Sequence, residues 1–283
     1  MQNTDTLVGT PTTVTTLTPL LREIDADLET PVSVYLKLSS EGPAFLLESV
    51  SGGERVGRYS FVGLRPRAAF IIDGSNVLYC HGCGLSHRET LAGNEPLDVL
   101  REMLQRHHLE STHGLPRLVG GLVGYLSYDA ARFFEPTLRP PLHTLPDGIF
   151  LLTDTLVAFD HARARVLAIA HAYGNTPAAH KEAVARLDAI ERRLAQPRPK
   201  TAPAGAFKPH QQLSHDQAAF EAIVTRAKEH IAAGDIFQVV LSQHITRHTP
   251  AQAFSIYRAL RRLNPSPYMF FFDFGGLTPE PLS

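Results

Sequence analysis

Two cysteines in a Cys-x-x-Cys spacing are residues that could bind a metal or exchange a disulfide. Cys80 and Cys83 enclose His81 and Gly82 where a strand-like stretch ends. A structural zinc site needs a second pair of ligands, and a redox pair needs a helix start that lowers a thiol pKa. The sequence shows neither feature, and two cysteines cannot supply a disulfide framework. We therefore interpret this pair as structural and predict that a hydrophobic core holds the fold together.

Glycines and histidines provide two further candidates. Gly120, Gly121 and Gly124 lie close together, but the Lys and the Ser or Thr that complete a phosphate-binding loop do not follow them. We interpret these glycines as places where two backbones approach closely within a sheet. The 14 histidines, including His107 and His108, do not repeat the spacing of metal ligands on a helix. The residue pattern therefore predicts no metal site.

Composition excludes several classes of protein. The chain has 283 residues, 43% of them hydrophobic and 19% charged, which is enough apolar material for one large or two ordinary cores. Its 27 basic and 28 acidic residues give no broad positive field that would attract nucleic acid. The N-terminus lacks a targeting pattern, and no apolar run approaches the length of a membrane span. We expect a cytoplasmic protein without nucleic-acid or membrane partners.

The elements that must position any site are first read from turn signals and periodicity. Residues 1–17 are Thr-rich, and we expect them to be flexible. Thr18 and Pro19 predict a helix to about residue 28, which Thr30 and Pro31 would end. Strand patterns follow, separated by Gly, Pro and Asp turn signals, at residues 32–38, 44–48, 58–62, 68–72 and 76–80. The chain therefore opens with a β-rich region.

Helix and strand patterns then mix without regular alternation. Residues 96–107 and 176–194 predict helices, the second opened by Thr176 and Pro177, while residues 118–128 form an apolar Gly-rich segment. Two strands are expected at residues 149–159 and 166–172. Residues 196–213 are Pro-rich and polar, which is typical of a linker. We place the main internal boundary there.

Beyond this linker the pattern predicts four more elements. Ser214 and Gln217 predict a capping box for a helix that Gly234 would end. A strand at residues 236–243, a helix at residues 249–264 and a strand at residues 268–274 follow. The last strand is almost wholly apolar and needs cover on both faces. Little chain remains to provide that cover, so we expect further chain or a partner to supply it.

Four segments, in this order, are similar to one known family. They are LLES at residues 46–49 with GERVGRYSFVG at residues 53–63, GGLVGYLSYDAARFFEP at residues 120–136, AGDIFQVVLSQ at residues 233–243, and NPSPYM at residues 264–269. Together they resemble anthranilate synthase component I, the large subunit of that enzyme, from about residue 18 to residue 274. The resemblance implies an α+β fold of layered antiparallel sheets flanked by helices. Residues 18–195 would form the regulatory region, and residues 214–283 the start of the chorismate-binding domain.

The resemblance implies a reaction, a metal and a partner. Members of this family make anthranilate and pyruvate from chorismate and ammonia, which a glutamine amidotransferase subunit, component II, supplies. They require Mg2+ and are inhibited by tryptophan. Their catalytic histidine and magnesium-binding glutamates have no counterparts that can be named in this sequence. We therefore expect a C-terminally truncated chain that lacks catalysis on its own.

The resemblance also assigns a tryptophan site to two short stretches. It consists of Glu48 and Ser49, at the end of one predicted strand, with Pro267, Tyr268 and Met269 at the start of another. A carboxylate for the ammonium group, a hydroxyl for the carboxylate and apolar walls for the ring suit an aromatic amino acid. The structural alternative is that these residues only end one strand and begin another.

Gln238 bears on the type of reaction. Relatives that hydrate chorismate resemble this chain but carry a lysine at that place, and an amide cannot activate water as a base. Gln238 is thus a possible active-site contact and favours ammonia as the nucleophile. His244 departs from an arginine that is frequent in the family, and Arg58 is interpreted as covering the sheet. The alternatives are a non-catalytic tryptophan-binding module and aminodeoxychorismate synthase component I. The LLES and GERVGRYSFVG segments favour anthranilate synthase over aminodeoxychorismate synthase.

Overall fold

The computed structural model describes residues 14–25, 28–39, 42–49, 57–82, 85–91, 95–110, 113–135, 137–138, 145–199 and 210–277. Its contacts divide the chain into two units. The first contains residues 1–200 and 260–283, and the second contains residues 201–259. Residues 214–283 were expected to form one region, whereas the contacts assign residues 260–283 to the first unit. The reason is a strand, β14, that joins a sheet of the first unit.

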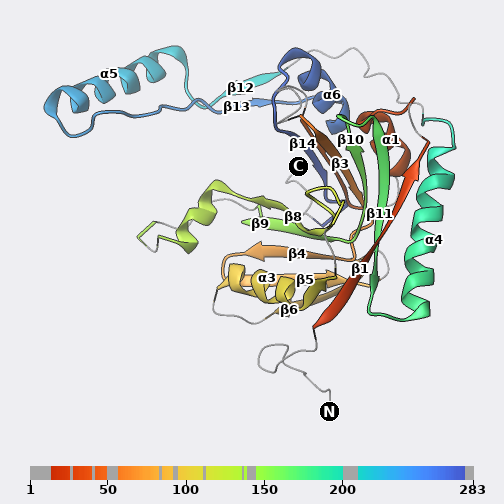
Figure 1. Cartoon of the computed structure of the whole chain (residues 1–283). Helices are drawn as coiled ribbons and strands as arrows, with labels where there is room; N and C mark the ends of the chain where they lie inside the picture. Colours follow the sequence, from red (N-terminus) through yellow and green to blue (C-terminus); the bar gives the residue numbers. More distant parts are fainter. Residues whose placement is uncertain are drawn as a thin grey trace. The chain divides into compact units, whose positions relative to one another are not determined.

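A seven-stranded sheet forms one layer of the first unit (Figure 1). Neighbouring strands are antiparallel except for β1 and β7, which are parallel. The order across the sheet is β14 (Met269–Asp273), β2 (Ala44–Glu48), β3 (Tyr59–Leu64), β10 (Thr155–Asp160), β11 (Arg165–Tyr173), β1 (Thr15–Ile24) and β7 (His107–Leu109). The strand β14 therefore lies at an edge, with β2 as its neighbour.

A five-stranded antiparallel sheet forms the other layer. Its order is β6 (His87–Leu91), β5 (Asn76–His81), β4 (Ala68–Asp73), β9 (Gly148–Thr153) and β8 (Gly121–Leu126). The single strand expected at residues 149–159 is divided at Asp154, because β9 belongs to this sheet and β10 to the larger one. One continuous apolar run thus links the two layers.

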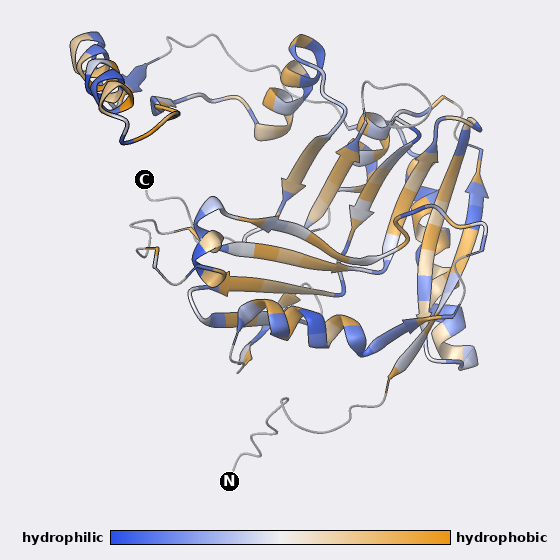
Figure 2. Ribbon diagram, turned by 60° about the vertical axis from the view of Figure 1, so that its left-hand side comes forward, coloured by the Kyte–Doolittle hydropathy of each residue, from blue (hydrophilic) through white to orange (hydrophobic). Residues whose placement is uncertain are grey.

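The core lies between the two sheets. Phe45 from β2 packs with Ile71 from β4 and Ile149 from β9, all of them buried. Figure 2 shows hydrophobic residues along the strands of both sheets. This is the layered α+β arrangement of antiparallel sheets and flanking helices that the sequence predicted.

Helices cover the outer faces. The helix α4 (Pro177–Leu194) packs against β11 and β1, α1 (Pro31–Leu38) packs against β2, β3 and α4, and α3 (Pro96–Gln105) packs against β5 and β7. Thr176 caps α4 by accepting a hydrogen bond from the backbone of Ala179, as its Thr-Pro start predicted. A short 3-10 helix, η2 (Tyr128–Phe133), follows β8. No helix within the described ranges is both long and apolar enough to cross a membrane.

The glycines of the GGLVG segment allow close backbone contact. A Cβ atom on Gly124 would lie 1.9 Å from the carbonyl oxygen of Ile149 in the neighbouring strand. A Cβ atom on Gly120 would lie 2.8 Å from the carbonyl oxygen of Thr153. The interpretation of these glycines as sites of close approach within a sheet is confirmed.

The second unit contains a two-stranded ribbon and helices. β12 (Gln211–Leu213) pairs with β13 (Ile245–Arg247), and α5 (Gln217–Ala233) lies between them in the sequence. The helix α6 (Ala253–Leu263) begins in this unit and ends in the first. Gly234 ends α5 in the left-handed conformation, as predicted.

Several expectations about individual elements are wrong. The predicted helix at residues 18–28 is the strand β1, and the predicted strand at residues 32–38 is the helix α1. Thr30 and Pro31 start α1 as its N-cap and first residue instead of ending an earlier helix. Asp216, not Ser214, caps α5. Residues 236–243 form no strand.

Candidate functional site

The end of β2 and the start of β14 lie side by side at an edge of the seven-stranded sheet. In the antiparallel register, Met269 is opposite Glu48 and Phe270 is opposite Leu47. The rings of Phe271 in β14 and Tyr35 in α1 make an edge contact, with centroids 5.7 Å apart. This contact packs β14 against α1. The expectation that these two distant stretches meet in space is confirmed.

Glu48 is a buried carboxylate with a defined partner. Arg261, in the last turn of α6, donates from Nε to Oε2 at 2.9 Å and from Nη2 to Oε1 at 3.0 Å. The Glu48 side chain is 2% exposed and that of Arg261 is 32% exposed. A bidentate pair of this kind fixes the plane of the carboxylate. Arg261 therefore sets the orientation of Glu48.

Ser49 has a buried hydroxyl without a partner. Its Oγ is inaccessible to solvent and makes no hydrogen bond to the part of the chain that the structure describes. An unsatisfied buried hydroxyl costs about 1–3 kcal/mol, and such exceptions in native proteins call for an explanation. A ligand that accepts or donates a hydrogen bond at this point would remove that cost.

Residues 267–269 of the NPSPYM segment have apolar or aromatic side chains that differ in their exposure. Met269 is 7% exposed and belongs to the core, whereas Tyr268 is 77% exposed. Pro267 lies between buried and exposed. The register thus places the buried Met269 opposite Glu48 in the neighbouring strand, and the exposed ring of Tyr268 precedes it in the chain.

A second polar cluster lies close to Glu48. Ser60 and His161 share a hydrogen bond between Oγ and Nε2 at 2.8 Å. Burial lowers the pKa of His161, and the nearby carboxylate of Glu48 opposes this shift. Arg58 donates to Asp160 from its Nε and Nη2 nitrogens, and this hydrogen bonding lowers the pKa of the Asp160 carboxyl. This ion pair gives Arg58 a structural role at the end of β10.

Gln238 lies in the second unit and is exposed in a segment without regular structure. Its placement on a strand was wrong. His244 pairs with Ser214 through two hydrogen bonds, one of them from the His244 backbone to the Ser214 hydroxyl at 3.0 Å. The structure thus gives His244 a place in the β12–β13 ribbon. Whether Gln238 contacts a substrate stays a prediction.

Metal ligands do not gather within the described ranges. No group of three or more His, Cys, Asp or Glu side chains there could hold a metal ion. Cys80 is buried in β5, burial raises the pKa of its thiol, and Cys83 lies outside the described residues. The residues present in this part of the chain therefore do not fit the magnesium site that the resemblance implies.

Sequence reasoning missed two members of this site. Arg261 is the partner of Glu48, and His161 lies within electrostatic reach of both. Arg261 stands three residues before NPSPYM, at the end of a predicted helix, which was a usable signal for a cation near Met269. His161 lies in a polar turn, and no feature of that turn distinguishes it.

Comparison with known proteins identifies the family of the chain. A family model described as chorismate binding enzyme matches residues 42–282. Anthranilate synthase component 1 of Pseudomonas putida is 37% identical over an alignment of 280 residues, which covers 93% of this chain and 56% of the relative. The probable anthranilate synthase component 1 of Schizosaccharomyces pombe is 37% identical, with 93% of this chain and 53% of the relative covered. The chain thus spans about half the length of these curated relatives.

Two solved structures share the fold. Anthranilate synthase component I from Streptococcus pneumoniae TIGR4 superposes with a TM-score of 0.63 at 24% identity, covering 91% of this chain and 56% of that one. The menaquinone-specific isochorismate synthase of Escherichia coli gives a TM-score of 0.56 at 16% identity, covering 92% and 48%. These two likenesses concern the fold alone. On the match of its residues 42–282, the chain belongs to the family of chorismate binding enzymes, within which it is similar to anthranilate synthase component 1.

Proposed function

We propose that the chain carries the tryptophan-sensing site of an anthranilate synthase component 1. The observation that supports this most is the pairing of Glu48 with Met269, beside the unpartnered hydroxyl of Ser49. These residues come from the two stretches to which the family resemblance assigns the inhibitor. An acid, a hydroxyl and a buried thioether meet here at the ends of two neighbouring strands.

Each part of tryptophan finds a suitable group at this edge. The ammonium group donates to the carboxylate of Glu48, whose orientation Arg261 sets. The tryptophan carboxylate accepts a hydrogen bond from Ser49 Oγ, which relieves the cost of the buried hydroxyl. The indole ring packs against Met269 and the neighbouring Pro267 and Tyr268, where sulfur and proline surfaces favour an aromatic ring.

The whole protein would convert chorismate and ammonia to anthranilate, pyruvate and water. Gln238 favours ammonia over water as the nucleophile, because its neutral amide cannot deprotonate water. Ammonia would come from a glutamine amidotransferase subunit, and magnesium would be held by residues beyond those described. We place the protein in the cytoplasm, where chorismate chemistry needs no membrane anchor.

Calorimetry with tryptophan tests the sensing role. We expect heat of binding for the unaltered chain and at least about tenfold weaker binding for Ser49→Ala, because one buried charge-assisted hydrogen bond is lost. Ser39→Ala, at the C-terminal end of α1, is the matched control and should bind as the unaltered chain does. Absence of binding heat in the unaltered chain would refute the proposal.

The folate-pathway relative, aminodeoxychorismate synthase component I, is the second candidate. Its product differs from anthranilate, so incubation of the whole protein with chorismate, ammonium and magnesium discriminates the two. We expect no anthranilate fluorescence from these 283 residues alone, because the described ranges hold no cluster of metal ligands. Formation of aminodeoxychorismate by the whole protein would favour the second candidate, and robust anthranilate formation by the 283 residues alone would contradict the expected lack of catalysis.

A further inference from the structure

A row of four buried residues crosses the seven-stranded sheet at the proposed tryptophan site. The register pairs Met269 with Glu48 and Ser60 with Phe159. The pairing of β2 with β3, continued by one residue, places Glu48 opposite Ser60. Directly opposed residues of antiparallel strands direct their side chains to the same face. These four residues, none of them more than 7% exposed, therefore lie next to one another on one face of the sheet.

His161, which directly follows β10, is held at this row by two contacts. Its Nε2 and the Ser60 Oγ share a hydrogen bond of 2.8 Å. Its ring stacks on that of Phe159, with centroids 6.1 Å and planes 18° apart. The rest of the residue is exposed, so it exchanges protons with solvent. Because Nε2 can accept from a hydroxyl group when neutral and donate to it when protonated, the ring keeps its place while its charge changes.

The charged groups around His161 form balanced pairs. Glu48 and Asp160 favour the charged form of the imidazole, and Arg261 opposes it. Glu48 is bound by Arg261, and Asp160 is bound by Arg58. Each pair is neutral as a whole. A proton on His161 therefore gives this group of side chains a net positive charge.

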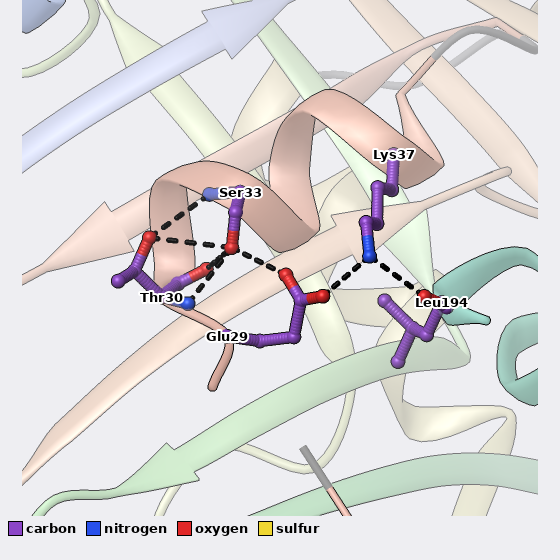
Figure 3. A network of polar contacts seen from close by, with 5 residues as sticks. All are labelled: Glu29, Thr30, Ser33, Lys37 and Leu194. Carbon is purple, nitrogen blue, oxygen red and sulfur yellow. Dashed lines mark hydrogen bonds and ion pairs between the residues drawn. The ribbon is translucent and has the colours of Figure 1, made fainter. Parts of the chain in front are cut away.

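The helix α1 packs on the same face and adds no unbalanced charge there. The rings of Tyr35 and Phe271 are in contact, and Phe271 shares its face of β14 with the methionine of the row. Lys37 is the one charged residue of α1. Figure 3 shows that its ammonium group pairs with Glu29, and it also donates to the carbonyl oxygen of Leu194 at 2.7 Å. The helix thus brings neither a histidine nor an unpaired charge to this face.

We propose that the charge of His161 controls how tightly the tryptophan site holds the ammonium group of its ligand. This inference rests on the proposed function, in which that ammonium group donates to Glu48. Because Glu48 and Ser60 are neighbours, a proton on His161 places a second positive charge close to that of the ligand. The ligand carboxylate is assigned to Ser49, which is not a member of the row, so its attraction to the imidazolium offsets only part of this repulsion.

Acid should therefore weaken the binding of tryptophan. Partial burial lowers the pKa of His161 from its ordinary value of 6.5, so the ring is neutral at pH 7.5. It gains a proton as the pH falls through the lowered pKa, and the affinity for tryptophan falls with it. Free tryptophan keeps both of its charges between pH 7.5 and 5.0, so the change arises in the protein. By linkage, bound tryptophan must lower the pKa of His161 further.

Calorimetry with tryptophan at pH 7.5 and 5.0 tests the proposal, with circular dichroism to verify the fold at both values. We expect the unaltered chain to bind about threefold to tenfold more weakly at pH 5.0. His161→Gln, which can still bond to Ser60 but has no charge, should bind equally at both values. His161→Lys, which is charged throughout, should bind weakly at both. His108→Gln, in β7 at the opposite edge of the sheet, is the matched control and should behave as the unaltered chain does.

Titration of the histidine ring signals by NMR gives a second measurement on the unaltered chain. Saturating tryptophan should lower the pKa of His161, and the His161→Gln spectrum assigns its signal. Affinity that does not change with pH, a pH dependence that persists in His161→Gln, or equal affinities of the Gln and Lys variants would overturn the inference and leave the tryptophan site in place. An absence of binding at pH 7.5 in the unaltered chain would refute both.

Discussion

Arg261 donates two hydrogen bonds to the buried carboxylate of Glu48, although the two residues are 213 positions apart in the chain. A carboxylate that is 2% exposed is stable in its charged form only with such a partner. The pair therefore connects the last turn of α6 to the end of β2, and β14 follows eight residues after Arg261. Arg261 is a positioning residue for the proposed tryptophan site.

The variant Arg261→Gln should destabilise the chain by about 1–3 kcal/mol, because it leaves the charge of Glu48 partly uncompensated. Arg262→Gln, one position later and exposed, is the matched control and should change the free energy of unfolding by less than about 0.5 kcal/mol. Urea unfolding measures both. Equal effects of the two variants would show that the ion pair is not a determinant of stability.

Glu48→Gln combined with Arg261→Gln extends this test. Loss of both charges should lower the free energy of unfolding by less than the sum of the two single changes, because the double variant does not leave one charge of the pair buried alone. Strictly additive costs would mean that the two side chains do not act on each other.

Gly124→Ala should destabilise the fold by about 3 kcal/mol, since the new methyl group would collide with the backbone of Ile149. Gly114→Ala is the control. It has a positive φ but no atom within 4 Å of a new Cβ, so only backbone strain of about 1 kcal/mol is expected. Thermal and urea unfolding give the difference. A Gly124→Ala chain as stable as Gly114→Ala would mean that β8 and β9 do not approach as described.

Stability should fall as the pH is lowered below about 6.5, the ordinary pKa of histidine. Burial lowers the pKa of His171 in the folded chain, where this residue is 2% exposed and its ring lies beside Gly120. The unfolded chain then binds a proton that the folded chain does not, so acid favours unfolding by up to about 1.4 kcal/mol per pH unit. The stability is fully present above the unfolded pKa.

His171→Phe removes this titration and should flatten the dependence of the unfolding free energy on pH between 7.5 and 5.5. Burial also lowers the pKa of His161, which should leave a smaller slope of the same sign. Urea unfolding at several pH values measures the slopes. An unchanged slope in His171→Phe would assign the acid sensitivity to other groups.

Local sequence signals predicted the elements whose ends are marked by characteristic residues. The Thr176-Pro177 start of α4, the end of α5 at Gly234 and the strand β2 agree with the structure. Each depends on the residue itself: an N-cap hydroxyl, a left-handed glycine, or a short apolar run bounded by turns. The meeting of residues 48–49 with residues 267–269 was predictable from the family resemblance.

Elements determined by distant partners were not predictable in this way. Residues 15–24 have an apolar pattern that fits a helix, yet they form β1 because β11 offers an eight-residue antiparallel partner. Residues 236–243 have a strand-like pattern but no pairing strand, and Phe237 is 94% exposed. The pair of Arg261 and Glu48 could not be found because no local pattern specifies a contact between residues so far apart.

The methyl groups of methionine give the most direct test of the proposed tryptophan site. The chain has three methionines, Met1, Met103 and Met269, so selective labelling yields three assignable signals. Tryptophan bound beside Glu48 and Ser49 should shift the Met269 methyl signal through the indole ring current. Met103, on α3, should stay in place, and Ser49→Ala should suppress the shift. A Met269 signal that does not move at saturating tryptophan, or one that moves together with Met103, would contradict the assignment of this strand pair as the inhibitor site.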